Sequence, residues 1–247
     1  MKAVLITGAA GGIGSALVRV FSDAGYGVIA TDLAARPADL PCEHYFACDL
    51  RRTVEDESFA SEVFSGMRKV LDGRPLAALI NNAAIQLLGP ADTLSREDWR
   101  ATLDVNLLAP FLWAQAFLPE LEAARGVVLN MSSIHARLTK PSFIAYATSK
   151  AALTGMTRAM AVELGARVRI NAIEPAAIDT PMLRAGFAGN PSGFDLLKNF
   201  HPSRSIGSAE GLARLAVSIV RSEDIFTNGS IIPLDGGIGN QLHDPGC

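Results

Sequence analysis

Short apolar runs alternate with longer amphipathic stretches along the whole chain, and this alternation limits the available folds more than any other feature. Most of the short runs are continuously apolar, which is typical of strands buried on both faces of a parallel sheet. The predicted strands are Ala3–Thr7, Gly27–Thr31, His44–Ala47, Leu76–Ile80, Gly126–Asn130, Val168–Ile173 and Ser230–Leu234.

The amphipathic stretches between these strands have the length of helices. They are Gly12–Ala24, Phe59–Leu71, Arg96–Glu122, Ala145–Leu164 and Ala209–Val220. Ser95, followed three positions later by Asp98, predicts a capped start for the third of them. Strand–helix–strand units joined by right-handed crossovers predict an α/β fold, a doubly wound parallel β-sheet flanked by helices on both faces.

No low-complexity linker divides the 247 residues, so a single domain over 1–247 is predicted. One segment, Asp179–Gly207, is rich in Pro, Gly and Ser and follows neither periodicity. A long irregular stretch inside a compact domain is usually a functional loop. We therefore expect 179–207 to form an irregular substrate-binding flap that becomes ordered when a ligand binds.

Charge and cysteine content exclude several classes of function. Twenty-two basic and 25 acidic residues give a net charge of −3, and the basic residues form no cluster beyond Arg51-Arg52, so neither nucleic acid nor a membrane is an expected partner. Cys42, Cys48 and Cys247 are too few for a disulfide framework or a zinc site, and no metal is predicted. With no cleavable signal before the first strand, the expected location is the cytoplasm.

A glycine-rich turn follows the first predicted strand and opens the first predicted helix. Gly8 permits a tight turn, Gly12 and Ile13 bring backbone N–H groups close to a phosphate, and Gly14 allows close packing of helix against strand. The second strand runs directly into Asp32, the place where dinucleotide-binding folds use an acid to bind the ribose hydroxyls. Alone, Asp32 is better explained as a solvated strand-end carboxylate or a helix cap; together, the two features predict a dinucleotide site.

Further motifs follow in a fixed order. They are Thr7–Gly14, Cys48-Asp49-Leu50, Asn81-Asn82-Ala83-Ala84, Val105-Asn106-Leu107, Ser133, Tyr146-Ala147-Thr148-Ser149-Lys150, Asn171–Thr180 and Pro233–Gly237. In these motifs the chain resembles the short-chain dehydrogenase/reductase (SDR) family, in its short single-domain branch. The resemblance covers essentially the whole chain and implies a Rossmann-like, NAD(P)-binding domain. Ala84 and Ala176 stand where the family has glycine.

The resemblance assigns roles residue by residue. It implies that Asn106, Ser133, Tyr146 and Lys150 are catalytic. The implied cofactor-binding residues are Gly8, Gly12, Ile13, Gly14, Asp32, Asp49, Leu50, Asn82, Tyr146, Lys150, Pro175, Ile178 and Thr180. By position, Gln86, His135 and Ala177 are expected to contact the substrate.

The chemistry of these residue types fits an exchange between an alcohol and a ketone. Tyr146 and Lys150 lie four residues apart and so share one face of a helix. A nearby ammonium, together with the positive charge of the oxidised nicotinamide, is expected to lower the tyrosine pKa from about 10, which makes Tyr146 a proton carrier. Ser133 would bind the substrate oxygen, and by the resemblance Asn106 would hold a water that connects Lys150 to solvent.

These motifs predict an NAD(H)-dependent oxidoreductase of a secondary alcohol or ketone. NAD(H) is preferred to NADP(H) because Asp32 would repel a 2′-phosphate, and Arg36 is the nearby cation to consider. The pocket residues fit a polyol, a sugar derivative, a hydroxy acid or a 3-oxoacyl thioester. The alternatives are a 3-oxoacyl thioester reductase and an NAD-binding sensor without turnover; a methyltransferase fits the glycine spacing and the Tyr/Lys pair less well.

A homotetramer is also predicted. The stretch after Asn106 carries Phe111, Trp113, Phe117 and Leu121, and the helix of Tyr146 is lined by small residues. Related proteins pair these two helices across two-fold axes, and the tail after Gly237 often packs near a neighbour. A competing explanation is that the four apolar side chains only cover the sheet.

Overall fold

A parallel sheet of seven strands forms the centre of the computed structural model, which describes residues 1–242. The strand order is β3-β2-β1-β4-β5-β6-β9. Their bounds are β1 Ala3–Thr7, β2 Gly27–Asp32, β3 His44–Ala47, β4 Leu76–Asn81, β5 Val127–Met131, β6 Arg169–Pro175 and β9 Ile231–Leu234. All seven predicted strands are present, and the doubly wound parallel fold is confirmed.

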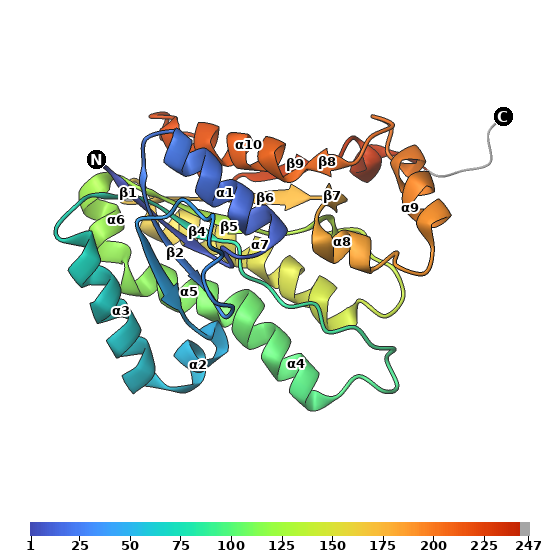
Figure 1. The fold of residues 1–247 in the computed structure, drawn as a ribbon, viewed down its shortest axis with the longest axis horizontal. Coiled ribbons are helices and arrows are strands. Elements are labelled where there is room, and N and C mark those ends of the chain that lie inside the picture. The colour runs from blue at the N-terminus through green and yellow to red at the C-terminus, as the bar shows by residue number, and fades with distance from the viewer. Residues whose placement is uncertain (243–247) are drawn as a thin grey trace.

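Alternate residues of each strand pack on opposite faces of the sheet, as the pleat requires. In β1, Val4 and Ile6 pack on the side of α1 (Gly12–Asp23) and α10 (Ala209–Arg221), whereas Leu5 packs on the other side. Figure 1 shows α1 and α10 together above the sheet and most of the remaining helices below it. Burial on both faces explains why the strands are continuously apolar.

The helices of the second face connect the remaining strands. They are α2 Leu50–Glu55, α3 Glu57–Leu71, α4 Arg96–Leu103, α5 Ala109–Ala116, α6 Leu118–Ala124 and α7 Ile144–Leu164. Trp113, Phe117 and Leu121 are fully buried in the apolar core on this face, with Phe64 edge-on to both aromatic rings. These three side chains therefore cover the sheet, and of the four residues considered for a subunit contact only Phe111 is exposed.

The single helix predicted over 96–122 is wrong. A π-helical turn, Asp104–Leu108, separates α4 from α5, and the chain bends by 61° before α6. The bend lies at Phe117, shortly before Pro119, whose nitrogen cannot donate a helical hydrogen bond. The predicted start is confirmed, because the Ser95 side chain accepts a hydrogen bond from the Asp98 backbone N–H.

The prediction that 179–207 is irregular is also wrong. The segment contains β7 (Ile178–Asp179), α8 (Pro181–Ala185), α9 (Pro191–Leu197), a 3₁₀ turn (Lys198–Phe200) and β8 (Gly207–Ser208), and β7 pairs with β8. Thr180 caps α8 and Asn190 caps α9, each helix beginning at a proline. Helices of five and seven residues are too short to show an apolar period.

The strand order reverses between β1 and β4, and this places the loops after both strands side by side. Open α/β sheets bind ligands at such a point, outside the carboxyl ends of the strands. Figure 1 shows α8 and α9 beyond the arrowhead of β6, at this same end of the sheet. The fold therefore brings the glycine turn, the loop after β4 and the flap to one edge.

Among residues 1–242, no single helix is long and apolar enough to cross a membrane, although Arg96–Ala116 and Leu118–Ala124 meet the criterion when the bent pair is taken together. Cys42 and Cys48 are buried free thiols. Cys247 and the last part of the predicted tail lie outside the described residues.

Candidate active site and cofactor cleft

Two glycines of the turn after β1 have no room for a side chain. Gly8 has a φ of +66°, and a Cβ there would lie 2.7 Å from the Ala83 Cα of the loop after β4. A Cβ on Gly14 would lie 1.9 Å from the Gly8 carbonyl oxygen. Glycine is therefore required at both positions. Gly14 lets α1 pack against the turn after β1, and Gly8 lets this turn pack against the loop after β4.

The start of α1 has the properties of a phosphate site. No side chain of residues 1–242 caps this terminus, whose N-cap is Gly11. The first N–H groups of a helix lack intrahelical partners and attract anions. A Cβ on Gly12 would lie 2.9 Å from the Cβ and Cγ2 atoms of Thr180, so the bare backbone of this turn faces the start of the flap. The N–H groups at this helix start could hold a phosphate group, and Thr180 packs directly against Gly12 beside them.

The Asp32 carboxylate lies directly beside the glycine turn. Its Oδ2 accepts a hydrogen bond from the Ala10 N–H at 2.9 Å, and its Oδ1 accepts one from the Ala34 N–H at 3.0 Å. Each oxygen keeps a lone pair for a ligand hydroxyl. Asp32 is therefore held at the carboxyl end of β2 in a position where it can bind the ribose of a dinucleotide.

Asn82 and Asp49 have structural partners of their own. The Asn82 Nδ2 donates to the carbonyl oxygens of Thr7 and Gly8, both at 3.0 Å, and so ties the loop after β4 to the glycine turn. Asp49 caps α2 by accepting a hydrogen bond from the Arg51 N–H at 2.9 Å. Both amide hydrogens of Asn82 are thus occupied, and the oxygen of this side chain remains for a ligand.

Ser133 and Tyr146 meet just beyond the carboxyl end of β5. The Ser133 Oγ accepts a hydrogen bond from the His135 N–H at 3.2 Å, which leaves its O–H free to donate. Burial raises the pKa of Tyr146, whereas a hydrogen bond from Ser133 acts to lower it. In the protein alone, desolvation of the phenolate therefore outweighs the hydrogen bond, and the lowering expected from Lys150 together with an oxidised nicotinamide stays a prediction for the site with cofactor bound.

Lys150 lies one helical turn beyond Tyr146 on α7, as the spacing predicts. Its Nζ lies 5.6 Å from the centre of the Tyr146 ring and donates to the Met131 carbonyl oxygen at 2.7 Å. The side chain is buried, and desolvation lowers the pKa of Lys150 to about 8. An ammonium with this pKa can release its proton near physiological pH.

Asn106 lies in the π-helical turn and is fully buried. Its Nδ2 donates to the Ile85 carbonyl oxygen at 2.9 Å and to the Ser149 Oγ at 3.0 Å, while its Oδ1 accepts from the Ile85 N–H at 2.8 Å. Ser149 in turn donates to the Tyr146 carbonyl oxygen at 2.7 Å. Asn106 therefore joins the loop after β4 to the helix of Tyr146; both of its amide hydrogens have protein partners.

His135 packs against Phe143 and against the ring of Tyr146. Its ring stacks on Phe143, with centroids 4.4 Å apart, and lies edge-on to Tyr146 at 5.8 Å. Desolvation, followed by the charge of Lys140, lowers the pKa of His135 to about 4. A neutral imidazole next to Tyr146 can form a hydrogen bond with a polar substrate group without changing the charge of the site.

The remaining predicted residues lie at the same edge of the sheet. Leu50 begins α2, Pro175 ends β6, Ile178 is buried in β7, Ala177 lies between these two strands, and Gln86 lies in the loop after β4. That loop reaches α7, because the Gly89 N–H donates to the Ser142 carbonyl oxygen at 3.0 Å.

The two alanines that replace family glycines introduce no backbone strain. Four non-glycine residues of the described chain have a positive φ, namely Asp72, Arg125, Ser142 and Arg204. Ala84 and Ala176 are not among them, so both adopt a backbone conformation that alanine tolerates.

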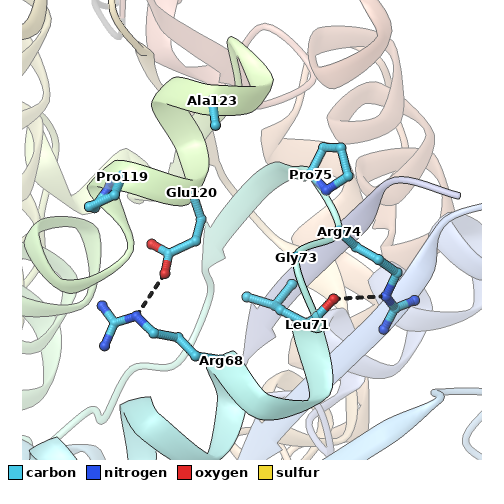
Figure 2. A pocket seen from close by; sticks show the side chains of 8 residues that line it. All are labelled: Arg68, Leu71, Gly73, Arg74, Pro75, Pro119, Glu120 and Ala123. Carbon is cyan, nitrogen blue, oxygen red and sulfur yellow. Dashed lines mark hydrogen bonds and ion pairs between the residues drawn. The ribbon is translucent and has the colours of Figure 1, made fainter.

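A cavity of about 390 Å³ lies at the opposite end of the sheet. Figure 2 shows its lining, in which Arg68 pairs with Glu120 at 2.7 Å and Pro75 precedes the start of β4. A second hollow of about 260 Å³ lies within the flap, where Phe187 and Phe194 pack edge-on and Arg184 pairs with Asp179. Neither hollow includes Ser133 or Tyr146, so the site is an arrangement of loops at the strand ends rather than one of these cavities.

Three features of the site had no counterpart among the predicted residues. Ser149 was passed over as a variable position of the Tyr-x-x-x-Lys motif, although it links Asn106 to Tyr146. Phe143 forms the stack with His135. Glu174 is a buried carboxylate in β6, and a charge inside a buried strand is the one signal that would have marked it.

Comparison with known proteins gives consistent matches over the whole chain. A family model described as short chain dehydrogenase matches residues 2–190. D-threitol dehydrogenase of Mycolicibacterium smegmatis is 32% identical, with 96% of this chain and 92% of that protein covered. NAD-dependent glycerol dehydrogenase of Listeria innocua is 30% identical, with 96% and 93% covered.

The solved structure of 4-hydroxyisoleucine dehydrogenase complexed with NADH superposes with a TM-score of 0.86 at 26% identity, covering 98% of this chain and 100% of that one. The predicted motifs, the observed sheet and these matches agree, and the chain belongs to the short-chain dehydrogenase/reductase family of oxidoreductases.

Proposed function

We propose that this protein is an NAD(H)-dependent oxidoreductase that interconverts a secondary alcohol and its ketone. The observation that carries the proposal is the grouping of Ser133, Tyr146 and Lys150 at the carboxyl end of β5, beside an uncapped helix start. A bound nicotinamide would supply the hydride acceptor or donor. The chain's own residues then have to orient the substrate oxygen and move one proton.

Tyr146 is the residue placed to move that proton. In ketone reduction its O–H donates to the substrate oxygen, and in alcohol oxidation its oxygen accepts the hydroxyl proton. Ser133 donates a hydrogen bond to the same substrate oxygen, since its own oxygen already accepts from the His135 N–H. Lys150 stabilises the phenolate form by its charge and, with the pKa lowered to about 8, can pass a proton onward.

The preference for NAD(H) is supported by the surroundings of Asp32. Arg36, the cation considered as a partner for a 2′-phosphate, donates instead to the carbonyl oxygens of Leu40 and Cys42 at 2.9 and 3.0 Å. The Arg36 guanidinium is therefore bound to backbone oxygens and does not pair with the Asp32 carboxylate. A relative named NAD-dependent glycerol dehydrogenase and a solved relative with NADH agree with this choice.

The substrate we infer is a small polyhydroxylated alcohol or the matching ketone. Relatives named D-threitol dehydrogenase and glycerol dehydrogenase support this class. The neutral His135 ring beside Tyr146 would bind a second hydroxyl group next to the reacting carbon.

The buried free thiols of Cys42 and Cys48 are in keeping with a reducing compartment such as the cytoplasm.

We further infer a homotetramer that contacts through the outer faces of α5 and α7. Leu108, Phe111 and Ile144 are large apolar side chains exposed around these helices, and Val162 near the end of α7 is 85% exposed. Exposed apolar side chains grouped on adjacent elements are typical of subunit contacts.

The proposal is tested with Tyr146→Phe. We expect turnover to fall below one tenth of wild type on every good substrate, because the proton carrier is lost while the ring stays packed. The Kd for NADH, measured by fluorescence, should stay within about twofold. Substrates come from a screen of polyols, sugars, hydroxy acids and 3-oxoacyl thioesters in both directions. Activity of Tyr146→Phe above one tenth of wild type would exclude Tyr146 as the proton carrier. If the wild-type protein itself bound NADH but turned over no substrate, the alternative of an NAD-binding sensor would be favoured.

A further inference from the structure

A carboxylate with no role in the proton transfer lies buried beneath the site. Glu174 of β6 directly precedes Pro175 and is only 1% exposed. Its Oε2 accepts a hydrogen bond from the Arg137 Nε at 2.9 Å, and Arg137 is 41% exposed. A buried carboxylate is costly unless it is paired, so this guanidinium compensates a charge that the strand would not otherwise hold.

The other oxygen of Glu174 leads to the catalytic helix. Its Oε1 accepts from the Thr154 Oγ1 at 3.2 Å, and Thr154 lies on α7. The Thr154 hydroxyl is 2.9 Å from the Ser132 Oγ, which donates to the Lys150 carbonyl oxygen at 3.2 Å. Glu174 is therefore connected both to the backbone of Lys150 and to the residue immediately before Ser133.

Arg137 connects the same carboxylate to the segment that follows Ser133. Its Nη2 lies 3.7 Å from the Oδ2 of Asp235, just after β9. Asp235 in turn accepts from the N–H groups of Gly237 and Gly239 at 2.9 and 3.2 Å. A Cβ on Gly239 would lie 2.9 Å from the Arg137 Nη2, so the guanidinium is enclosed by this turn. Arg137 thus joins the Ser133 segment to the ends of both β6 and β9.

The segment between β5 and α7 needs such an anchor. At its far end Ser142 has a φ of +72°, a strained value for a non-glycine residue, and is held there by the Gly89 N–H. Near its start, the Arg137 side chain is hydrogen-bonded to Glu174 of β6. His135 lies two residues before Arg137 and Phe143 directly follows Ser142, and these two rings stack on each other beside Tyr146.

We propose that Arg137 and Glu174 are positioning residues, an ion pair with a buried carboxylate that fixes Ser133 and the Lys150 backbone relative to Tyr146; this inference rests on the proposed oxidoreductase function. They act through Ser132, Thr154 and the chain from Ser133 to Arg137. Misplacement of catalytic groups by about 1 Å can lower a rate by a factor of about 100. The pair should therefore matter for kcat far more than for cofactor affinity.

The test compares Arg137→Met, Glu174→Gln and the double variant with Arg74→Met. Arg74 pairs with Glu43 at 2.7 Å at the opposite end of the sheet and serves as the matched control. Arg137→Met should lower Tm, because it leaves the Glu174 carboxylate buried without its partner. The double variant removes both charges and should regain most of that Tm, while kcat stays about 10- to 100-fold below wild type. The Kd for NADH should stay within about twofold throughout.

A second readout does not depend on turnover. Hydrogen exchange in residues 134–142 should become faster in Arg137→Met and in the double variant, and remain unchanged in Arg74→Met. Glu174→Gln removes the other charge of the pair and keeps the size of the side chain. If Arg137→Met does not fold, exchange in residues 134–142 of Glu174→Gln is compared with that of Arg74→Met instead.

Recovery of kcat together with Tm in the double variant would show that the pair only stabilises the fold, and would overturn the proposal. Unchanged exchange in 134–142 would overturn it as well. Absence of turnover in the wild type would contradict the proposed function instead, and the exchange experiment would then decide on the ion pair alone.

Discussion

At the scale of single residues, burial decides the protonation of the site. Desolvation raises the pKa of Tyr146 and lowers that of Lys150 to about 8, so at pH 7 the phenol keeps its proton while the lysine remains mostly charged. A tyrosine that keeps its proton at neutral pH is prepared to donate it in ketone reduction. Alcohol oxidation needs the phenolate and should become faster as the pH rises.

Lys150 should reduce the stability of the fold at neutral pH. Its pKa falls from 10.5 to about 8 on folding, so the unfolded chain binds more protons between these values. Stability from this group is therefore lowest below pH 8 and rises as the pH increases toward 10.5. The free energy of unfolding of Lys150→Met, taken relative to that of wild type, should consequently be higher at pH 7 than at pH 10 by about 2 to 3 kcal/mol.

The measurement is chemical denaturation of both proteins at the two pH values. The lost hydrogen bond to the Met131 carbonyl oxygen affects both pH values equally, so the difference isolates the titration. A stability difference between variant and wild type that does not change with pH would contradict the lowered pKa.

Asp32 should determine the choice between NAD(H) and NADP(H). A 2′-phosphate about 4 Å from its carboxylate would meet a repulsion of about 4 kcal/mol per charge pair before screening. Even 2.7 kcal/mol corresponds to about a hundredfold preference. We expect kcat/KM to favour NAD(H) by about a hundredfold or more in wild type, and the ratio to move toward one in Asp32→Ala. An unchanged ratio in the variant would exclude Asp32 from the cofactor site.

At the scale of elements, short helices and interruptions shape the site. The π-helical turn places Asn106 against Ile85 and Ser149, and a continuous helix over 96–122 would not have this register. The flap begins with Thr180, which caps α8 and lies against Gly12 of the glycine turn. A ligand held at the start of α1 would therefore touch the flap at its first residue.

This contact makes the flap the segment that should respond to the cofactor. We expect NADH to slow hydrogen exchange across residues 180–197, because the first turn of α8 gains a partner while α9 is carried with it. The long helix α10, residues 209–221, serves as an internal control and should not change. Equal exchange in 180–197 with and without NADH would contradict the idea of a closing flap.

At the scale of the whole molecule, the helices that cover the sheet carry several exposed apolar side chains of their own. Phe111 and Leu108 remain exposed near the π-helical turn, and Ile144 at the start of α7. These side chains flank the elements that carry Asn106 and Tyr146. Association through them would hold the catalytic helix from outside as well as from within the chain.

Light scattering should therefore report four chains of 26.1 kDa each at micromolar concentration. Phe111→Glu is expected to shift the distribution toward dimers or monomers, since a charge would be buried in the contact. Val4→Ala, a change inside the core, serves as a control that lowers stability without altering the contact face. A stable monomer in the wild type would exclude the tetramer.

Much of this architecture could be predicted because its signals are local. Continuous apolar strands, the spacing of Gly8 and Gly14, and the Tyr146–Lys150 pair depend only on strand burial, turn sterics and helix periodicity. Short capped helices such as α8 were missed, because a helix of five residues has too few positions to show a period.

The sequence by itself determined the sheet, the glycine turn and the placement of Tyr146 and Lys150 on one face of a helix, since each is encoded within a few neighbouring positions. Only the tertiary structure decided which distant groups surround them. Glu174 meets Arg137 and Thr154, and Asn106 meets Ile85, across separations that no local pattern records. The pKa directions of Tyr146 and Lys150 also follow from burial, which depends on how the strand ends and α7 pack together.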